Sequence, residues 1–264
     1  MANQSSAARG GATADRDAII AYLDDLLESG SFEDYGPNGL QVPGRRDVRL
    51  VVTGVSAHRD LFERAEDAGA DFVLCHHGIV WGAGPAVVTA QLKSRLEVLF
   101  RCDASLAAYH LPLDAHPEVG NNALLCEALG FERAEPFGSA RGRPIGFVGR
   151  SGRGVAAAEL VERCRAVTGR EPLVVGRGPD VVKSVGIVSG AGASTLDEAV
   201  GLGLDAFVTG EPAERVTADA REASMHFIAA GHHATETFGV RRIGELVAER
   251  FGVEHRFVDV PNPI

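Results

Sequence analysis

Strand-like and helix-like segments alternate along most of this chain, and this alternation limits the folds open to it more than any other feature. Apolar runs typical of buried strands occupy residues 49–55, 71–75 and 105–109, and the segments 59–68 and 89–102 between them have helical spacing. Short apolar runs joined by helices are typical of parallel strands whose two faces are both covered. The sequence therefore predicts an α/β protein with mixed, largely parallel sheets.

The same alternation continues in the rest of the chain. An amphipathic helix starts near Asp15 and is expected to end at Gly30, because glycine readily adopts the left-handed conformation that closes a helix. Residues 61–74 and 196–208 share the order helix, glycine turn, aspartate and apolar strand, which fits either a structural duplication or two ordinary connections. Further strands are expected at 145–149, 182–188, 206–209, 225–229 and 255–258, and further helices at 118–129 and 235–250.

Chain length and local composition indicate how the chain is divided. A length of 264 residues fits one large or two modest domains. The passage 136–144 is rich in Gly, Arg and Pro, so we place the start of a second domain there. Residues 1–14 are rich in Ser, Ala and Gly and lack the apolar core of a signal peptide, which predicts a disordered tail.

Charge and cysteine content exclude several classes of protein. The chain has 26 Lys and Arg against 36 Asp and Glu, a net charge of −10, and no long basic run, which argues against binding to nucleic acid. No apolar stretch approaches the roughly 18 to 20 residues of a membrane span. Four cysteines without a CxxC motif favour a reducing cytoplasm and no disulfide framework; they are Cys75, Cys102, Cys126 and Cys164.

Histidines gather directly after three of the predicted strands. The carboxyl ends of strands in an α/β protein open onto one crevice, so side chains placed there can meet. Imidazole and carboxylate ligands together suit Zn, Mn, Fe, Co or Ni, and a bridging carboxylate favours two ions about 3.5 to 4 Å apart. A dinuclear metal site is the resulting prediction. The clustered histidines are His76, His77, His110, His116, His232 and His233.

Spacing adds geometry to this prediction. His232 and Glu236 are one helical turn apart and can face the same point. His76 and His77 would point to opposite sides of an extended strand, so both can bind only if a turn starts there, which Gly78 permits.

Each of these features also has a structural interpretation. Asp114 could cap the following helix, Glu236 could be an ordinary acid of a first helical turn, and His233 could be a hydrogen-bonded structural residue. The segment 190–194, which is rich in Gly and Ala, could seat an anion or form a tight turn. The sequence contains no phosphate-binding loop, GxSxG or GxGxxG motif.

Several longer motifs carry a resemblance to a known family. They are Asp34–Val42, His76–Gly78, His110–Asn122, Thr209–Glu211, Gly231–Glu236 and Val260–Pro263. With these motifs in this order, the sequence resembles the NIF3-like proteins, also called the dinuclear metal centre, hexameric family or GTP cyclohydrolase 1 type 2 homologues, over nearly its full length.

The resemblance implies a two-domain α/β protomer and a toroidal homohexamer. Residues 15–135 and 226–264 would form a metal-binding domain around a smaller middle domain, 136–225. This chain lacks the large insertion that longer family members carry in the middle domain.

The resemblance also implies roles for individual residues. His110 would lie at the open side of the site, where it could hydrogen-bond a water or shuttle protons. Glu236 would bridge the two ions. The ligands of the two divalent ions would be His76, His77, Asp114, His232 and Glu236.

These inferences lead to hypotheses of different classes. The first is a metal-dependent hydrolase in which two ions activate water for attack on a small-molecule substrate. The family name implies GTP, opened at the purine C8, although a phosphoester or another heterocyclic amide remains open. The alternative is a non-catalytic metal-binding ring or scaffold, in metal handling or partner docking. A third hypothesis, a ring around DNA, conflicts with the acidic composition.

Overall fold

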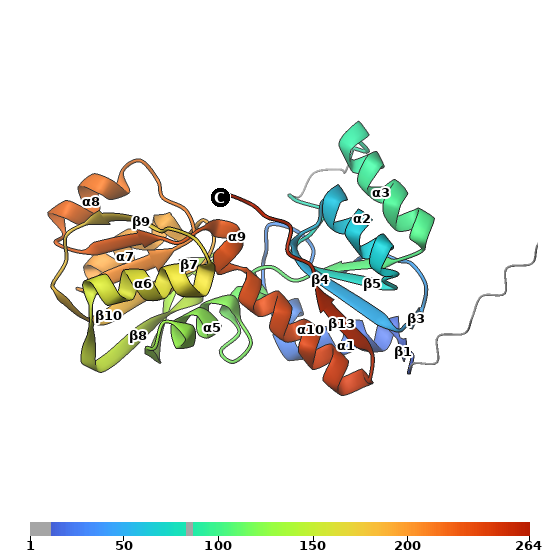
Figure 1. Ribbon diagram of the computed structural model, residues 1–264, viewed down its shortest axis with the longest axis horizontal. Helices are drawn as coiled ribbons and strands as arrows, with labels where there is room; N and C mark the ends of the chain where they lie inside the picture. Colours follow the sequence, from blue (N-terminus) through green and yellow to red (C-terminus); the bar gives the residue numbers. More distant parts are fainter. Residues whose placement is uncertain (1–11, 83–86) are drawn as a thin grey trace, which may run out of the picture.

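The structure of the protein, a computed structural model, describes residues 12–82 and 87–264. Two large sheets lie side by side, each covered by helices, as Figure 1 shows. The first sheet consists of five strands, in the order β13 (Glu254–Phe257), β4 (Leu50–Ser56), β5 (Phe72–His77), β6 (Ser105–Ala108) and β2 (Gly39–Val42). The second sheet consists of six, in the order β7 (Glu132–Ala140), β8 (Arg143–Ala156), β10 (Val181–Val188), β11 (Ala206–Thr209), β12 (His226–Ala229) and β9 (Leu173–Gly176).

A short antiparallel pair and the helices complete the described part of the chain. The pair joins β1 (Ala14–Asp15) to β3 (Asp47–Val48). The helices are α1 (Arg16–Leu27), α2 (Arg59–Ala68), α3 (Ala90–Cys102), α4 (Leu111–Ala115), α5 (Asn121–Ala128), α6 (Ala157–Thr168), α7 (Leu196–Gly201), α8 (Val216–Glu222), α9 (His232–Thr235) and α10 (Thr237–Phe251). Short 3₁₀ turns lie at Ser29–Ser31 and Gly192–Thr195.

The first sheet is buried on both faces. Successive side chains of a strand point to opposite faces, so Val51 and Val55 of β4 pack against α1 and α10, whereas Val52 packs against α2 and α3. Strands β13, β4, β5 and β6 are parallel, and β2 is the antiparallel edge. Burying both faces explains why β4 and β5 are continuous apolar runs in the sequence.

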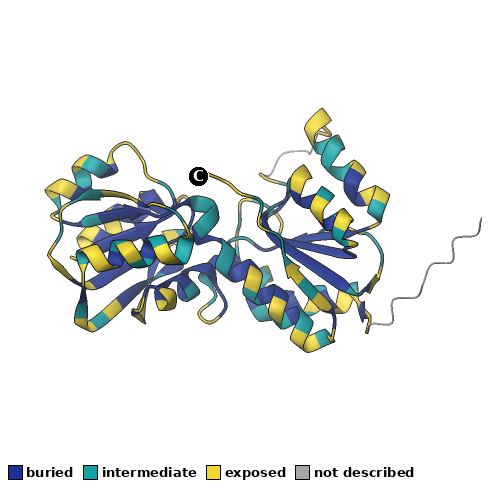
Figure 2. Ribbon diagram, in the orientation of Figure 1, coloured by how far each residue is buried: buried dark blue, intermediate teal, exposed yellow. Residues whose placement is uncertain are grey.

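The second sheet follows the same plan with more antiparallel strands. Its centre, β10, β11 and β12, is parallel, while the β7–β8 hairpin and β9 pair antiparallel. Helices α7 and α8 cover the face that contains Phe207, and α5 and α6 cover the face that contains Val208. In Figure 2 the strands of both sheets are mostly buried and the helices expose their outer sides. The predicted α/β class with mixed, largely parallel sheets is confirmed.

The limits of the second sheet differ from the expected division of the chain. Strand β7 starts at Glu132 and β12 pairs with β11, so the expected boundaries at 135/136 and 225/226 do not coincide with the limits of this sheet. The passage 136–144 contains the turn of the β7–β8 hairpin. Pro136 lies opposite Phe147 on the edge strand, next to a register shift, which is the kind of position at which proline occurs within sheets.

Several element ends also differ from the prediction. Ala14, expected in a disordered tail, is buried and pairs with Val48; residues 1–11 lie outside the described residues. Helix α1 ends at Leu27, and Glu28 rather than Gly30 takes the left-handed conformation, with φ of 49°. The helix expected at 118–129 starts only at Asn121.

The helix expected at 235–250 is interrupted. Glu236, with φ of −108° and ψ of 8°, separates the short helix α9 from α10. This interruption places the Glu236 side chain at the end of the second sheet, and α10 then runs on to pack against the first sheet (Figure 1).

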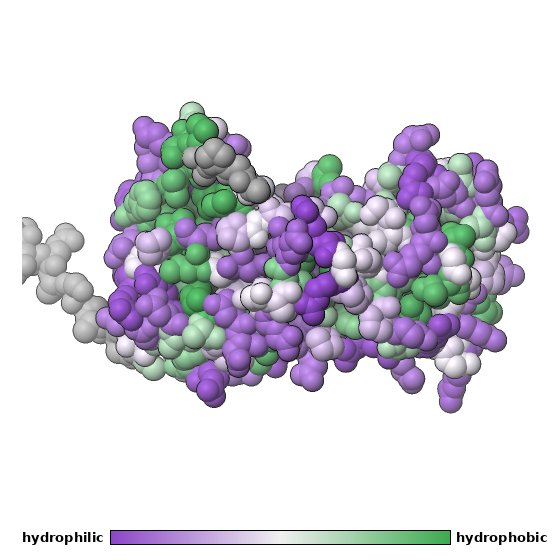
Figure 3. Space-filling model, turned by 180° about the vertical axis from the view of Figure 1, so that it is seen from behind, coloured by the Kyte–Doolittle hydropathy of each residue, from purple (hydrophilic) through white to green (hydrophobic). Residues whose placement is uncertain are grey.

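The remaining global features agree with the composition. All four cysteines are free thiols. Seen from behind, in Figure 3, the surface is largely hydrophilic, with a larger hydrophobic area at the end that holds α3 and a smaller one at the opposite end. Within residues 12–82 and 87–264, no helix is both long enough and apolar enough to cross a membrane.

Candidate metal centre

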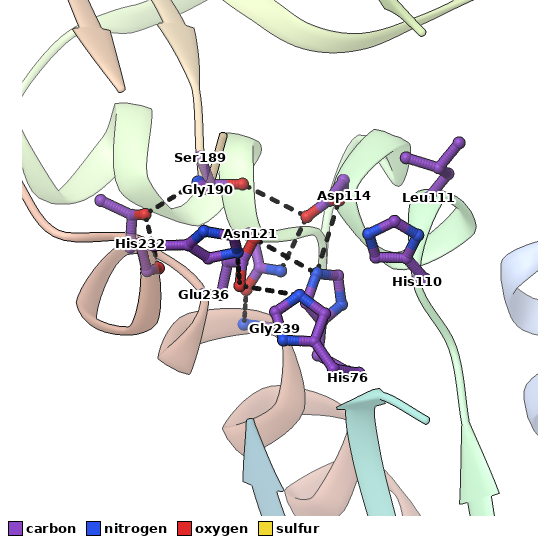
Figure 4. A network of polar contacts seen from close by, with 12 residues as sticks. His76, His110, Leu111, Asp114, Asn121, Ser189, Gly190, His232, Glu236 and Gly239 are labelled. Carbon is purple, nitrogen blue, oxygen red and sulfur yellow. Dashed lines mark hydrogen bonds and ion pairs between the residues drawn. The ribbon is translucent and has the colours of Figure 1, made fainter. Parts of the chain in front are cut away.

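Side chains from both sheets meet at one point between them. His76 and His77 end strand β5, and His110 follows β6. His232 lies in α9, after β12, and Glu236 follows α9 directly. Asp114, in α4, completes the group that Figure 4 shows from close by. The structure thus brings together all six residues that the sequence analysis selected for chemistry.

Glu236 lies at the centre of this group. Its Oε2 is 3.2 Å from Nε2 of His77 and 3.1 Å from Nε2 of His232. Its Oε1 is 3.5 Å from Nε2 of His76, which is also 3.5 Å from Oδ2 of Asp114. The carboxylate therefore faces imidazoles from both sheets.

Three sets of possible ligand atoms lie within 4.8 Å of one another. One set is His77, His232 and Glu236, and another is His76, Asp114 and Glu236. These two sets share only Glu236. The third set combines His76 and His77 with His110. Such groups of imidazole and carboxylate could hold a metal ion.

Unpaired buried atoms test whether a cation fits here. Nε2 of His76 and Oε2 of Glu236 are buried and have no hydrogen-bond partner in the described part of the chain. Buried polar atoms are nearly always paired, and leaving one unpaired costs about 1 to 3 kcal/mol. Both atoms belong to the sets of possible ligands, so a bound cation would give them a partner. The residues present fit a divalent metal ion.

The imidazoles share one mode of anchoring. His76 Nδ1 lies 3.0 Å from the carbonyl oxygen of Tyr109, so Nδ1–H donates and Nε2 is the nitrogen that faces the centre. His77 Nδ1 lies 3.0 Å from Oγ of Ser56, and His232 Nδ1 lies 2.5 Å from Oε1 of Glu211. Each ring is therefore oriented through Nδ1 and presents Nε2 to the centre, which is the usual arrangement of metal-binding histidines.

Burial and opposing charges shift the protonation of these groups. Burial alone would lower the pKa of His76, but the carboxylates of Asp114 and Glu236 raise this pKa to about 9. Likewise, Glu236 and Glu211 outweigh burial and raise the pKa of His232 to about 9. The carboxylates that raise these two pKa values carry negative charge, and a bound metal cation could neutralise it in place of the protons.

The pKa values of the other three groups shift for different reasons. Burial lowers the pKa of His77 to about 3, against the attraction of Glu236. Burial also raises the pKa of Asp114. In Glu236, the surrounding imidazoles of His76, His77 and His232 outweigh burial and hold the pKa well below its usual value. The centre therefore combines a neutral imidazole with an ionised carboxylate, as metal coordination requires.

Asp114 is held by two hydrogen bonds to one oxygen. Nδ2 of Asn121 donates to Oδ1 at 2.9 Å, and Oγ of Ser189 donates to the same oxygen at 3.2 Å. Oδ2 is left facing His76. The interpretation of Asp114 as a helix cap does not hold, because it lies inside α4 and is almost fully buried.

The glycine-rich segment after β10 can approach Glu236 closely because Gly190 has no side chain. Gly190 has φ of 60°, and a Cβ at this position would overlap Oε1 of Glu236. Its N–H donates to Oγ1 of Thr235 at 3.1 Å. The segment therefore forms a tight turn that lets the backbone approach the central carboxylate, in agreement with the second of its two interpretations.

Asp34 is a residue of the site whose role the sequence analysis missed. Its side chain is 2% exposed, and Oδ1 lies 2.7 Å from Nδ1 of His110. Oδ2 accepts the N–H of Leu111 at 2.9 Å and Nδ2 of Asn38 at 3.0 Å. No predicted strand flanks Asp34, so position along the chain gave no signal. The one signal for Asp34 in the sequence is its position at the start of the family motif Asp34–Val42.

Two of the clustered histidines lie outside the group. His116 Nδ1 accepts the N–H groups of Glu118 and Val119, both at 3.1 Å. His233 Nε2 lies 2.9 Å from Oδ1 of Asp259. The structural interpretation of His233 agrees with this contact.

Two helix-covered sheets with buried imidazoles and carboxylates gathered between them define an α/β protein with a candidate metal site between its sheets. The sequence profile of the family described as Duf34/NIF3 (NGG1p interacting factor 3) matches residues 14–263. The chain belongs to this family.

Relatives and solved structures agree with this assignment. A protein of Pseudomonas aeruginosa named GTP cyclohydrolase 1 type 2 homolog is 43% identical over 246 residues, which cover 93% of this chain and 97% of the relative. A protein of Escherichia coli K12 with the same name is 41% identical, covering 91% and 96%. The solved structure of protein ybgI, described as of unknown function, matches with a TM-score of 0.89 and 40% identity, covering 95% of this chain and all of that one.

A second solved structure extends the likeness. The protein TTHA1606 from Thermus thermophilus matches with a TM-score of 0.86 and 38% identity, covering 95% of this chain and 100% of that chain. The reduced form of HcgD from Methanocaldococcus jannaschii, at 22% identity and a TM-score of 0.82, has the same fold.

Proposed function

We propose that the protein is a dinuclear-metal-dependent hydrolase. The observation that carries this proposal is the pair of ligand sets that share only Glu236. His77 and His232 would hold one divalent ion, His76 and Asp114 the other, and Glu236 would bridge them. The mixed imidazole and carboxylate set accepts Zn, Mn, Fe, Co or Ni.

Two divalent ions held by these residues would supply a water molecule activated for attack near neutral pH. The chain's own groups supply the proton transfers. Nδ1 of His110 is engaged by Asp34, so Nε2 is the nitrogen that can give a proton to a leaving atom or take one from it. Asp34 fixes the orientation of the His110 ring through this contact.

The substrate belongs to the same proposal. The name of the bacterial relatives, GTP cyclohydrolase 1 type 2 homolog, supports GTP, opened by hydrolysis at a ring carbon, and a phosphoester is the other candidate. A homohexamer and a cytoplasmic location are the assembly and compartment that we propose with it.

Metal content and turnover, measured on the same samples, test the proposal. Elemental mass spectrometry of the wild type should give two ions per chain, and Glu236→Gln should give one or none. His232→Ala and His233→Ala form a matched pair, because only the first ring faces Glu236. We expect His232→Ala to lose metal and hydrolysis of GTP or a phosphoester, and His233→Ala to keep both.

Two other outcomes would change the conclusion. Two ions per chain without turnover of any nucleotide or phosphoester would overturn the hydrolase and support the metal-binding ring or scaffold. Less than one ion per chain in carefully prepared wild type would overturn the metal centre itself.

A further inference from the structure

A cavity opens over the candidate metal centre. Its volume is about 670 Å³, and His77, His110, Asp114, His232 and Glu236 line one part of it. Cavities of about 300 to 1,000 Å³ are typical of small-molecule sites. The rest of the lining decides which molecule the cavity can accept.

Trp81 forms an aromatic surface beside the histidines. The centroid of its ring lies 5.2 Å from that of His110 and 5.7 Å from that of His77. Its Nε1 donates to the carbonyl oxygen of Gly78 at 3.0 Å, yet the residue is 46% exposed. An indole that is anchored but exposed in a cavity offers its face to another planar ring.

Tyr35 adds a second aromatic side chain to the same part of the cavity. Its ring centroid lies 5.9 Å from that of His110, and the residue is 44% exposed. The Tyr35 carbonyl oxygen accepts the N–H of Gly82 at 2.6 Å, which ties its segment to the segment of Trp81. The two aromatic residues are therefore held in one part of the cavity wall.

Two arginines give the cavity positive charge. The guanidinium of Arg141, in the turn between β7 and β8, lies 4.3 Å from the centroid of the Tyr35 ring. Its ion pair with Glu33, at 3.8 Å, is exposed and therefore weak. Arg95, on α3, is half-buried, and no described carboxylate lies within ion-pair distance of it. Guanidinium groups placed like this bind phosphate or carboxylate.

We propose that the cavity binds a planar heterocycle that carries an anionic tail, with the ring against Trp81 and the tail at Arg95 and Arg141. This inference rests on the proposed function, because it assigns the substrate of the same site. Since the Trp81 ring lies 5.2 Å from that of His110, a heterocycle against Trp81 would lie next to the metal centre.

The position of the heterocycle indicates which bond of the substrate is hydrolysed. A bond within the heterocycle, rather than a phosphoester bond of the tail, would then be the one hydrolysed. Water adds across a ring C–N bond: its oxygen bonds to carbon, the C–N bond breaks, and a proton passes to the nitrogen, for which His110 is the candidate donor. The step needs no reactant other than water.

Trp81 is the only tryptophan of the chain, so its emission reports on this cavity alone. We would titrate the metal-loaded full-length protein with GTP, ATP and UTP, with the matching nucleosides, and with inorganic tripolyphosphate, checking by chromatography that each probe stays intact. At least one nucleotide should quench the emission, its nucleoside should quench with about tenfold weaker affinity, and tripolyphosphate should not quench.

Variants separate the two halves of the site. Arg95→Ala and Arg141→Ala should each weaken the nucleotide by about threefold to tenfold and leave the nucleoside unchanged. Arg153→Ala, on an exposed part of β8, is the matched control and should change neither. For the ring, calorimetry with Trp81→Leu and Trp81→Phe should show nucleoside binding lost in the first and partly kept in the second.

Quenching by tripolyphosphate equal to that by nucleotides, arginine variants that match Arg153→Ala, or no quenching by any probe would each overturn the inference. Hydrolysis of aliphatic phosphoesters without nucleotide quenching would also overturn it, while the proposed hydrolase would stand. The expected quenching pattern without turnover of any compound would support the binding site and overturn the hydrolase.

Discussion

Each sheet contains a parallel strand–helix–strand unit, β4–α2–β5 in the first and β10–α7–β11 in the second, and the two units begin alike. Oδ2 of Asp71 accepts the N–H groups of Arg49, at 2.8 Å, and Leu50, at 3.2 Å, where β4 starts. Asp205 occupies the same place in the second unit. Its Oδ2 accepts the N–H groups of Lys183 and Ser184, at 2.8 and 2.9 Å.

The two units end differently. Strand β5 ends in His76 and His77, whose Nε2 atoms face the centre directly. Strand β11 is followed by Glu211, which acts through another residue, because its carboxylate orients His232. In both units an aspartate before the second strand binds backbone N–H groups of the first strand and so holds the two strands together. The residues after the second strand differ, and they determine how each unit contributes to the candidate metal site.

Metal removal should have the largest effect on stability, because a bound metal ion would connect residues from the two sheets. A ligand at about 1,000 times its Kd stabilises the folded protein by about 4 kcal/mol, which for this size is a shift in Tm of about 10 °C. We expect chelation to lower Tm by this amount in calorimetry, and re-addition of metal to restore it. An unchanged Tm after verified metal removal contradicts the prediction.

The shared aspartates give the next largest effects. Asp71→Ala should destabilise the protein by about 3 kcal/mol, because the side chain of Asp71 is 2% exposed and two backbone N–H groups lose their acceptor. Urea denaturation measures this loss. A change below about 0.5 kcal/mol, the size expected of an ordinary surface substitution, would show that Asp71 does not fix the first unit.

Asp205→Ala tests whether the second unit depends on its aspartate equally. Asp205 is only half-buried, so water can replace part of what its carboxylate accepts. We expect a loss of about 1.5 kcal/mol in the same urea experiment. A loss equal to or larger than that of Asp71→Ala would reverse this ranking of the two units.

Glu211→Gln should have the smallest effect. The amide keeps the size of the side chain but removes the charge that holds His232, so metal affinity should fall by about tenfold, as for other residues that orient a ligand. Competition with a chelator of known affinity measures it. Glu214→Gln, an exposed glutamate nearby, is the control. Equal affinity in both variants would remove the role assigned to Glu211.

Much of the fold could be predicted because the central strands are buried on both faces. Such strands are continuous apolar runs, so β4, β5, β10 and β11 could be recognised locally. The β7–β8 hairpin could not, because Pro136 and the glycines around it resemble a linker. Only the pairing of β7 with β8 shows that this passage belongs to an edge strand.

The candidate site could be predicted in part for a similar reason. Histidines that follow buried strands are visible in the sequence, and parallel strands bring their carboxyl ends together. Asp34 and Glu211 could not be assigned roles, because each contacts a histidine far away in the sequence. Asp34 contacts His110, 76 residues away, and Glu211 contacts His232, 21 residues away. Such contacts depend on the three-dimensional path of loops, which local pattern does not encode.

The pairing of β13 with β4 has a consequence for synthesis. The second sheet lies within residues 132 to 229, so a growing chain can complete it while α10 and β13 are still in the ribosome. The first sheet must wait for Glu254–Phe257 to cover the edge of β4, about 200 residues after that edge was made. Until then the edge of β4 is unpaired, and an unpaired strand edge in a growing chain can pair with another chain.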